Sequence, residues 1–139
     1  MDIKIGSKAD KKAILKMRPD AASYFKGSSY FLVAQEADRI LGFAIVFRNK
    51  IPAPIKANEA FINLIEFFEE KDRGKGIASA MVQKVIETEQ GENTYQIRAY
   101  CDINNVASHR LWIKNGFGIS PVKMQNGDIL GSYVTYVLN

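Results

Sequence analysis

The sequence predicts one α/β (α+β) domain spanning residues 1–139, and three observations lead to this fold class. Strand-like and helix-like runs follow one another in the order β-α-α-β-β-β-α-β-α-β-β. A glycine-rich turn joins a strand-like run to a helix-like run in mid-chain, and Asn126-Gly127 separates the last two strand-like runs. A chain of this length can bury about two-thirds of its unfolded surface, which is enough for one hydrophobic core.

The first half of the chain is expected to hold a strand, two helices and a hairpin. Ser7 and Asp10 form a helix-capping pair, and periodic apolar residues follow until Pro19 ends the helix. The polar residues 36–39 connect two strand-like runs as a hairpin. The predicted elements are strands at 2–5, 30–35 and 40–47, with helices at about 7–19 and at 21–25.

The second half is expected to alternate strands and helices up to a final hairpin. Two prolines exclude a central strand from residues 49–58, because proline lacks the N–H group of the ladder. Apolar residues recur at helical spacing from Ile77, and Gly91 ends that helix. The predicted elements are strands at 62–68, 94–101, 117–124 and 129–138, with helices at 77–91 and 105–115.

Composition and charge narrow the classes of function. Hydrophobic residues make up 47% and charged residues 24%, as in ordinary globular proteins. No apolar run reaches the roughly eighteen residues that span a bilayer, and the N-terminal residues lack a signal-peptide pattern, so a cytoplasmic protein without membrane contact is expected. The only cysteine, Cys101, agrees with a reducing compartment. The net charge of +4 is spread over small basic groups and needs no nucleic-acid partner.

The segment Arg73-Gly74-Lys75-Gly76-Ile77-Ala78-Ser79 follows a strand-like run and opens a helix-like one. A helix start leaves backbone N–H groups unpaired and carries the positive end of the helix dipole, which suits a diphosphate. The glycines permit a tight turn, and nearby basic residues, Lys71 among them, add positive charge. The spacing excludes both the phosphate loop of nucleoside triphosphatases and the three-glycine dinucleotide fingerprint.

Two blocks of this chain resemble the GNAT superfamily of N-acetyltransferases. Arg-x-x-Gly-x-Ala at residues 73–78 is similar to its acetyl-CoA signature. Asn105, Ser108 and Trp112, followed by Gly116-Phe117, are similar to its last conserved block, about thirty residues further on. The resemblance implies a mixed, mostly antiparallel central sheet of about seven strands flanked by about four helices. Its fourth and fifth strands would splay apart to admit the pantetheine arm.

The resemblance also implies a reaction, a co-substrate and a set of binding residues. The reaction is direct attack of a primary amine on acetyl-CoA in a ternary complex, without a metal. The amine acceptor is unidentified, a homodimer is left open, and the acceptor would approach beside the first two helices and the last hairpin. The residues implied to bind acetyl-CoA are Phe67 and Phe68, through backbone amides at a strand bulge, then Arg73, Gly74, Lys75, Gly76, Ile77, Ala78, Ser79, Asn105, Ser108 and Trp112, with Lys114 on the same side.

Glu66 is the candidate catalytic base. It interrupts the apolar run 62–68, and a carboxylate in a central strand either faces the cleft or needs a partner. A carboxylate at this place could accept the proton of an ammonium group, directly or through water. The alternatives are an ordinary structural carboxylate, and a family mechanism in which the amine loses its proton to solvent.

Trp112 departs from the family pattern, because many relatives carry a tyrosine there that protonates the CoA thiolate. An indole N–H donates a hydrogen bond but does not release a proton near neutral pH. The thiolate could also leave unprotonated, since its pKa is near 8.5. The residues that could replace the tyrosine are Tyr100, Tyr133 and Tyr136.

Two hypotheses compete with the enzyme. The missing tyrosine is compatible with a non-catalytic acyl-CoA-binding regulatory module. A basic nucleic-acid-binding domain is disfavoured, because no single element interleaves aromatic and basic residues. His109 is expected to face solvent, and Cys101 to be a small buried residue rather than a nucleophile.

Overall fold

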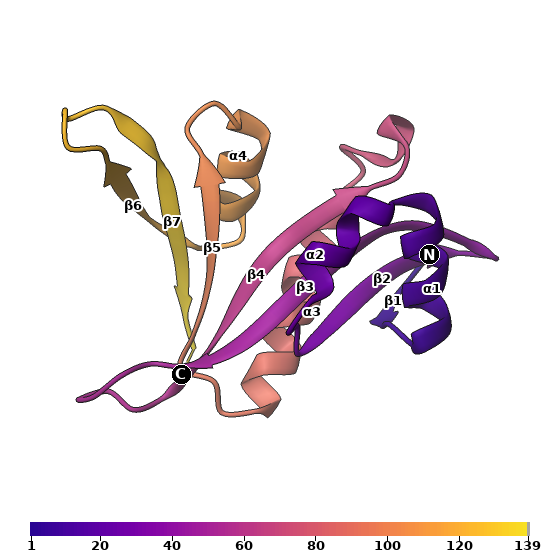
Figure 1. Cartoon of the computed structure of the whole chain (residues 1–139), viewed down its shortest axis with the longest axis horizontal. Coiled ribbons are helices and arrows are strands. Elements are labelled where there is room, and N and C mark those ends of the chain that lie inside the picture. The colour runs from indigo at the N-terminus through magenta and orange to yellow at the C-terminus, as the bar shows by residue number, and fades with distance from the viewer. Residues whose placement is uncertain (139) are drawn as a thin grey trace.

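The computed structural model describes residues 1–138 and confirms the predicted order of elements (Figure 1). Seven strands and four α-helices follow one another, with short 3₁₀ turns at Pro19–Ala21 and Glu70–Asp72. The elements are β1 (Asp2–Ile5), α1 (Lys8–Met17), α2 (Ala22–Phe25), β2 (Tyr30–Glu36), β3 (Arg39–Lys50), β4 (Asn58–Phe67), α3 (Ile77–Gly91), β5 (Gln96–Asp102), α4 (Val106–Lys114), β6 (Gly118–Lys123) and β7 (Ile129–Val137).

The strands form one mixed sheet in the order β1-β2-β3-β4-β5-β7-β6. Only β4 and β5 are parallel, and every other neighbouring pair is antiparallel. The parallel pairing begins at Glu59 opposite Gln96 and ends at Ile62 opposite Ala99. Both strands continue beyond that point, and Figure 1 shows them diverging. The predicted mixed sheet and its splayed fourth and fifth strands are therefore confirmed.

Helices cover both faces of the sheet, and each face has its own hydrophobic core. Alternate side chains of a strand point to opposite faces, and β3 shows this clearly. Phe43 and Ile45 pack with α1 and α2, whereas Ala44 and Val46 pack with α3 and α4. The sheet thus separates an α1/α2 face from an α3/α4 face, and the diverging ends of β4 and β5 lie between the two.

Local signals explain most element boundaries. Ser7 caps α1 as predicted, because its hydroxyl accepts the Asp10 N–H while the Asp10 carboxylate accepts the Ser7 N–H. The predicted loop at 49–58 is shorter than expected. Asn49 and Lys50 still pair with β4, so only residues 51–57, which hold both prolines, lie outside the ladder. Within residues 1–138, no helix is long and apolar enough to cross a membrane.

Candidate functional site

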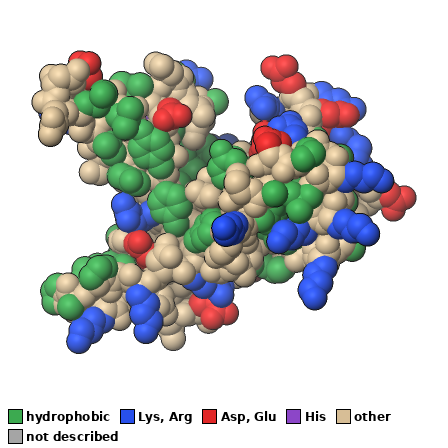
Figure 2. All heavy atoms as spheres, viewed as in Figure 1, with side chains coloured by type: hydrophobic (Ala, Val, Ile, Leu, Met, Phe, Trp, Pro, Cys, Tyr) green, Lys and Arg blue, Asp and Glu red, His purple; other side chains and the backbone are tan. Residues whose placement is uncertain are grey.

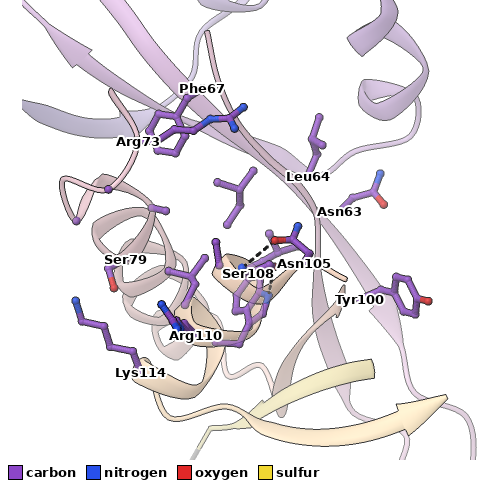
Figure 3. Close-up of a pocket in the computed structure, with 18 residues that line it drawn as sticks. Asn63, Leu64, Phe67, Arg73, Ser79, Tyr100, Asn105, Ser108, Arg110 and Lys114 are labelled. Atoms are coloured by element: carbon purple, nitrogen blue, oxygen red, sulfur yellow. Dashed lines mark hydrogen bonds between the residues drawn. The ribbon is translucent and has the colours of Figure 1, made fainter. Parts of the chain in front are cut away.

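A cavity of about 530 Å³ opens on the α3/α4 face, between the first turn of α3, helix α4 and the diverging ends of β4 and β5 (Figure 3). Its walls combine backbone and apolar side chains of β4 with the glycine-rich turn and one side of α4. Its charged lining residues are Arg73, Arg110 and Lys114, and none of the lining residues is acidic. The cavity therefore suits an elongated anionic ligand with an apolar section.

A bulge in β4 lies at the point where the gap opens. Ile45 pairs with Leu64, but its neighbour Val46 pairs with Ile62, so Asn63 is an extra residue in β4. The bulge predicted near Phe67 and Phe68 is therefore wrong in position. It lies next to the last parallel pair of β4 and β5, where β4 must turn away from its neighbour.

Beyond the bulge, β4 presents unpaired backbone groups to the gap. The Phe68 N–H donates to the Leu41 carbonyl of β3 at 3.1 Å. Backbone groups of successive residues in such a ladder point to opposite edges. The amides of Ile65 and Phe67 therefore point away from β3, toward the space that β5 has left. An extended chain that carries amide groups could hydrogen-bond there as an additional strand would.

The two phenylalanines assigned to the cofactor differ in position. Phe67 lines the cavity, and its ring is almost entirely buried. Phe68 packs in the other core, with its ring centroid 5.6 Å from that of Phe43, and its amide is already bonded to β3. The predicted contact of the Phe68 amide with the cofactor is therefore wrong, because this residue faces β3 and the α1/α2 side.

The glycine-rich turn has the backbone geometry that an anion site needs. Gly74 and Gly76 have φ values of +74° and +79°, and a Cβ at either position would point into open space. The first helical bond of α3 runs from the Ala80 N–H to the Gly76 carbonyl at 3.0 Å. The amides of residues 77–79 consequently have no acceptor within the helix and remain available to an anion.

The side chains of this turn do not all line the cavity, although the family resemblance assigns all of these residues to the cofactor. Arg73, Ala78 and Ser79 line the cavity together with both glycines. Lys75 is exposed and lies outside the cavity lining, and Ile77 is buried in the core, so these two can contribute only their backbone groups or long-range charge.

An ion pair anchors the turn to the sheet. Asp72, which is almost completely buried, accepts two hydrogen bonds from Arg39 at 3.0 and 3.2 Å. These bonds and the Arg39 charge hold the pKa of Asp72 below its ordinary value, so the carboxylate stays ionised. Arg39 begins β3, and the pair thus fixes the segment before Gly74 against the β2–β3 hairpin.

Helix α4 forms the opposite wall of the cavity. Asn105 caps it by accepting the Ser108 N–H at 3.0 Å, and Asn105 also lines the cavity. The Trp112 indole N–H donates to the Ser108 hydroxyl at 3.0 Å, and its buried ring lies 4.9 Å from the Phe117 ring. The three predicted residues of this block therefore lie together, with Trp112 bonded inside the wall.

A polar clip that the sequence did not reveal connects α3 with α4. The Asn115 side chain donates to the Ser79 hydroxyl at 2.8 Å and accepts from the Gln83 amide at 2.8 Å. The Asn115 side chain is almost fully buried at the end of α4. In the sequence, the position of Asn115 before Gly116 indicates only the end of a helix. No sequence signal therefore predicted its hydrogen bonds to α3. The clip holds the first two turns of α3 to the end of α4.

Glu66, the candidate base, lies on the α1/α2 face and does not line the cavity. It pairs with Phe43 in the ladder, and its carboxylate Oε1 accepts a hydrogen bond from Arg18 Nη1 at 2.5 Å. Arg18 also donates to the Phe67 carbonyl at 3.4 Å. Of the two arrangements that the sequence allowed, the carboxylate is thus paired, and about a quarter of its side chain is exposed.

The α1/α2 face is hollowed beside the gap (Figure 2). The wing formed by β5, β7 and β6 carries many hydrophobic side chains toward this hollow. Tyr100 and Tyr133, paired across β5 and β7, pack edge to face with centroids 5.4 Å apart. In Figure 3 the Tyr100 ring points away from the middle of the cavity. Burial and the nearby Asp102 raise the pKa of Tyr100, so its hydroxyl stays protonated at neutral pH.

The remaining candidates have structural contacts. Tyr136 packs on Phe117 at 5.4 Å between centroids, away from the gap. His109 Nδ1 lies 3.0 Å from the Asn105 carbonyl oxygen and 3.1 Å from the sulfur of Cys101, so the expectation that it simply faces solvent is wrong. Cys101 is buried as predicted. Among residues 1–138 there is no group of three side chains able to hold a metal ion.

Comparison with known proteins agrees with this geometry. The model of the acetyltransferase (GNAT) family matches residues 6–117. No curated protein matches the chain at a significant level. A ribosomal-protein-alanine N-acetyltransferase from Brucella melitensis is 18% identical, with a TM-score of 0.77 over 99% of this chain and 100% of that one.

Two further solved structures have the same fold. Arabidopsis thaliana NAA60, in complex with a bisubstrate analogue, is 14% identical, with a TM-score of 0.76 over 99% of each chain. A Bacillus subtilis acetyltransferase in complex with CoA is 16% identical, with a TM-score of 0.74 over 99% of this chain and 98% of that one. The family match assigns this split mixed sheet, with its glycine-rich helix start beside the split, to the acyltransferases. The chain belongs to the acetyltransferase (GNAT) family.

Proposed function

We propose that this chain transfers an acetyl group from acetyl-CoA to a primary amine within a ternary complex. The observation that supports this most is the fork between β4 and β5, which ends in free backbone amides beside the unpaired first turn of α3. The family match and the relatives solved with CoA or a bisubstrate analogue support the same ligand.

The co-substrate would bind along the cavity. Its diphosphate would accept hydrogen bonds from the amides between Gly74 and Ser79, with Arg73 beside it. Its pantetheine arm would lie in the gap as an added strand against Ile65 and Phe67. The thioester would then reach the bulge at Asn63, where backbone amides can polarise the acetyl carbonyl.

The amine would enter from the opposite face, where Glu66 lies. We assign to Glu66 the attraction of the ammonium group and the acceptance of its proton, directly or through water. Arg18 keeps the carboxylate in place and links it to the carbonyl of Phe67. Holding the amine and the thioester on the two sides of one gap would supply much of the rate by proximity.

The chemical step then needs no tyrosine at position 112. The amine nitrogen attacks the acetyl carbon, the carbon–sulfur bond breaks, and its electron pair leaves on the sulfur of CoA. The indole N–H of Trp112 already donates its hydrogen bond to Ser108. The thiolate would therefore leave unprotonated and take a proton from water. Because a thiol has a pKa near 8.5, releasing the thiolate instead of the thiol costs little free energy near neutral pH.

Thiol release from acetyl-CoA, measured with a panel of small amines, peptides with free N-termini and lysine peptides, tests the proposal. We expect release that depends on the amine and yields the acetylated product in equal amount. Tight acetyl-CoA binding without turnover on any amine would favour a non-catalytic acyl-CoA-binding module instead. Absence of acetyl-CoA binding would refute both.

A further inference from the structure

The cavity carries more positive charge than a diphosphate at the α3 turn would use. Arg110 and Lys114 line it from α4, in addition to Arg73 at the turn. None of the ion pairs found within residues 1–138 includes Arg110 or Lys114. Both side chains are exposed at the rim, and no carboxylate in the lining balances them.

The two cations lie on one side of α4. Residues four apart on a helix are neighbours, with their Cβ atoms roughly 5–6 Å apart. In Figure 3 both lie toward the α3 end of the cavity, whereas Asn63 and Tyr100 lie at its other end. The pair therefore lies away from Asn63 and the fork, on the α4 side of the cavity and apart from Arg73 at the turn.

Like charges one turn apart repel each other, so the helix itself gains nothing from this arrangement. Lys114 has an ordinary structural role, because a cation in the last turn of a helix interacts favourably with the helix dipole. Arg110 lies a turn earlier, and that argument does not account for it. An anion with two or more charges placed between the two side chains would turn their repulsion into attraction.

CoA carries such an anion. Besides the diphosphate that joins pantetheine to the nucleoside, its ribose bears a 3′-phosphomonoester. With the thioester at the fork and the diphosphate at the α3 turn, the nucleoside must leave the cavity at the α3 end. We infer that Arg110 and Lys114 together bind the 3′-phosphate, so that the chain selects CoA thioesters over their dephospho forms. The inference rests on the proposed function.

Calorimetry with CoA and with 3′-dephospho-CoA tests the subsite without requiring turnover. We expect the wild-type chain to bind dephospho-CoA roughly tenfold or more weakly, since hydrogen bonds to charged groups are lost. The double variant R110A/K114A should bind the two ligands within about twofold of each other, a difference worth under half a kilocalorie per mole.

A matched control removes the same charge elsewhere. Lys12 and Lys16 are also exposed and four residues apart on a helix, but α1 lies on the other face of the sheet. K12A/K16A should keep the full preference for CoA. The single variants Arg110→Gln and Lys114→Gln, each losing part of the preference, keep the test valid if the double variant folds poorly.

Three results would overturn the inference. Equal wild-type affinity for the two ligands would show that the 3′-phosphate is not recognised, while the proposed function would stand. An unchanged preference in R110A/K114A would place recognition elsewhere. If neither ligand binds, the subsite and the proposed function fail together.

Discussion

Ile62 of β4 and Ala99 of β5 are the last residues at which these two parallel strands pair. Asn63, the extra residue of the β4 bulge, follows immediately. The bulge and the end of pairing thus coincide, so the backbone amides of β4 are released into the gap at one defined point. The proposed binding of the cofactor and the proposed acetyl transfer both depend on this coincidence.

The positive φ of Gly76 in the glycine-rich turn predicts that a methyl group added there weakens acetyl-CoA binding. Gly76→Ala should raise the dissociation constant of acetyl-CoA roughly tenfold or more, because a side chain at φ +79° strains the turn that positions the helix amides. The substitution also costs about 1–2 kcal/mol of stability, since φ is +79°.

Gly127→Ala is its matched control. Gly127 has φ of +93° and equally open space, but it lies in the β6–β7 turn. It should show a similar stability loss with unchanged acetyl-CoA affinity by calorimetry. If Gly76→Ala also left the affinity unchanged, the diphosphate would not lie at this turn.

The position of Glu66, paired with Arg18 on the α1/α2 face, predicts that removing its charge slows acetyl transfer to the amine. Glu66→Gln should lower kcat by about a hundredfold, because the amide cannot accept the ammonium proton, while acetyl-CoA affinity stays the same. Steady-state kinetics and calorimetry measure the two quantities. Glu87→Gln, an exposed change on α3, should alter neither. An unchanged kcat and pH profile in Glu66→Gln would show that solvent takes the proton.

The bonded indole of Trp112 predicts a structural rather than an acid–base role. Trp112→Phe should keep the packing on Phe117 but lose the bond to Ser108, at about 1 kcal/mol of stability. We expect kcat with a saturating amine to stay within about threefold, well below the roughly hundredfold effect of losing a general acid. A much larger loss of kcat with intact cofactor affinity would assign the indole a direct part in thiolate departure.

Glu89 predicts how stability depends on pH. This fully buried carboxylate on α3 accepts hydrogen bonds from Tyr30, Arg48 and Thr94. Burial alone would raise the pKa of Glu89, but the hydrogen bonds, led by those from Arg48, outweigh it and lower the pKa below 4.5. Its contribution is therefore complete above pH 4.5 and is lost as the pH falls below that value.

Glu89→Gln should cost about 3 kcal/mol or more in the free energy of unfolding at pH 7, measured with denaturant, because Arg48 loses its buried partner. The loss of stability on acidification should also be shallower in the variant. Glu92→Gln removes an exposed carboxylate 3.9 Å from the same guanidinium and should cost less than about 0.5 kcal/mol. Equal costs for the two variants would contradict the buried network.

Local signals in the sequence predict the elements and the two blocks of the site that resemble the family pattern. Ser7 and Asp10, the glycine-rich turn and Asn126-Gly127 each act within a few residues, so spacing alone identifies them. The glycine at position 42, inside β3, is a further local signal, because a strand glycine indicates close packing. A Cβ there would lie 2.5 Å from the Glu66 carbonyl oxygen, which is the close packing that a strand glycine indicates.

Features that depend on distant partners were not predictable from local spacing. The position of the bulge follows from how β4 pairs with β3, and the sequence carries no marker of that register at Asn63. The partner of Glu66, Arg18, lies 48 residues away. His109 reads as a surface residue until the end of β5 brings the Cys101 sulfur to 3.1 Å from its ring.

A crystal structure of the chain with acetyl-CoA tests the central claim most directly. We expect density for the diphosphate within hydrogen-bonding distance of the amides from Gly74 to Ser79. The pantetheine should lie between β4 and β5, with the acetyl carbon beside Asn63. Density for the cofactor on another surface, or pantetheine outside the fork that begins after Ile62 and Ala99, would contradict the account.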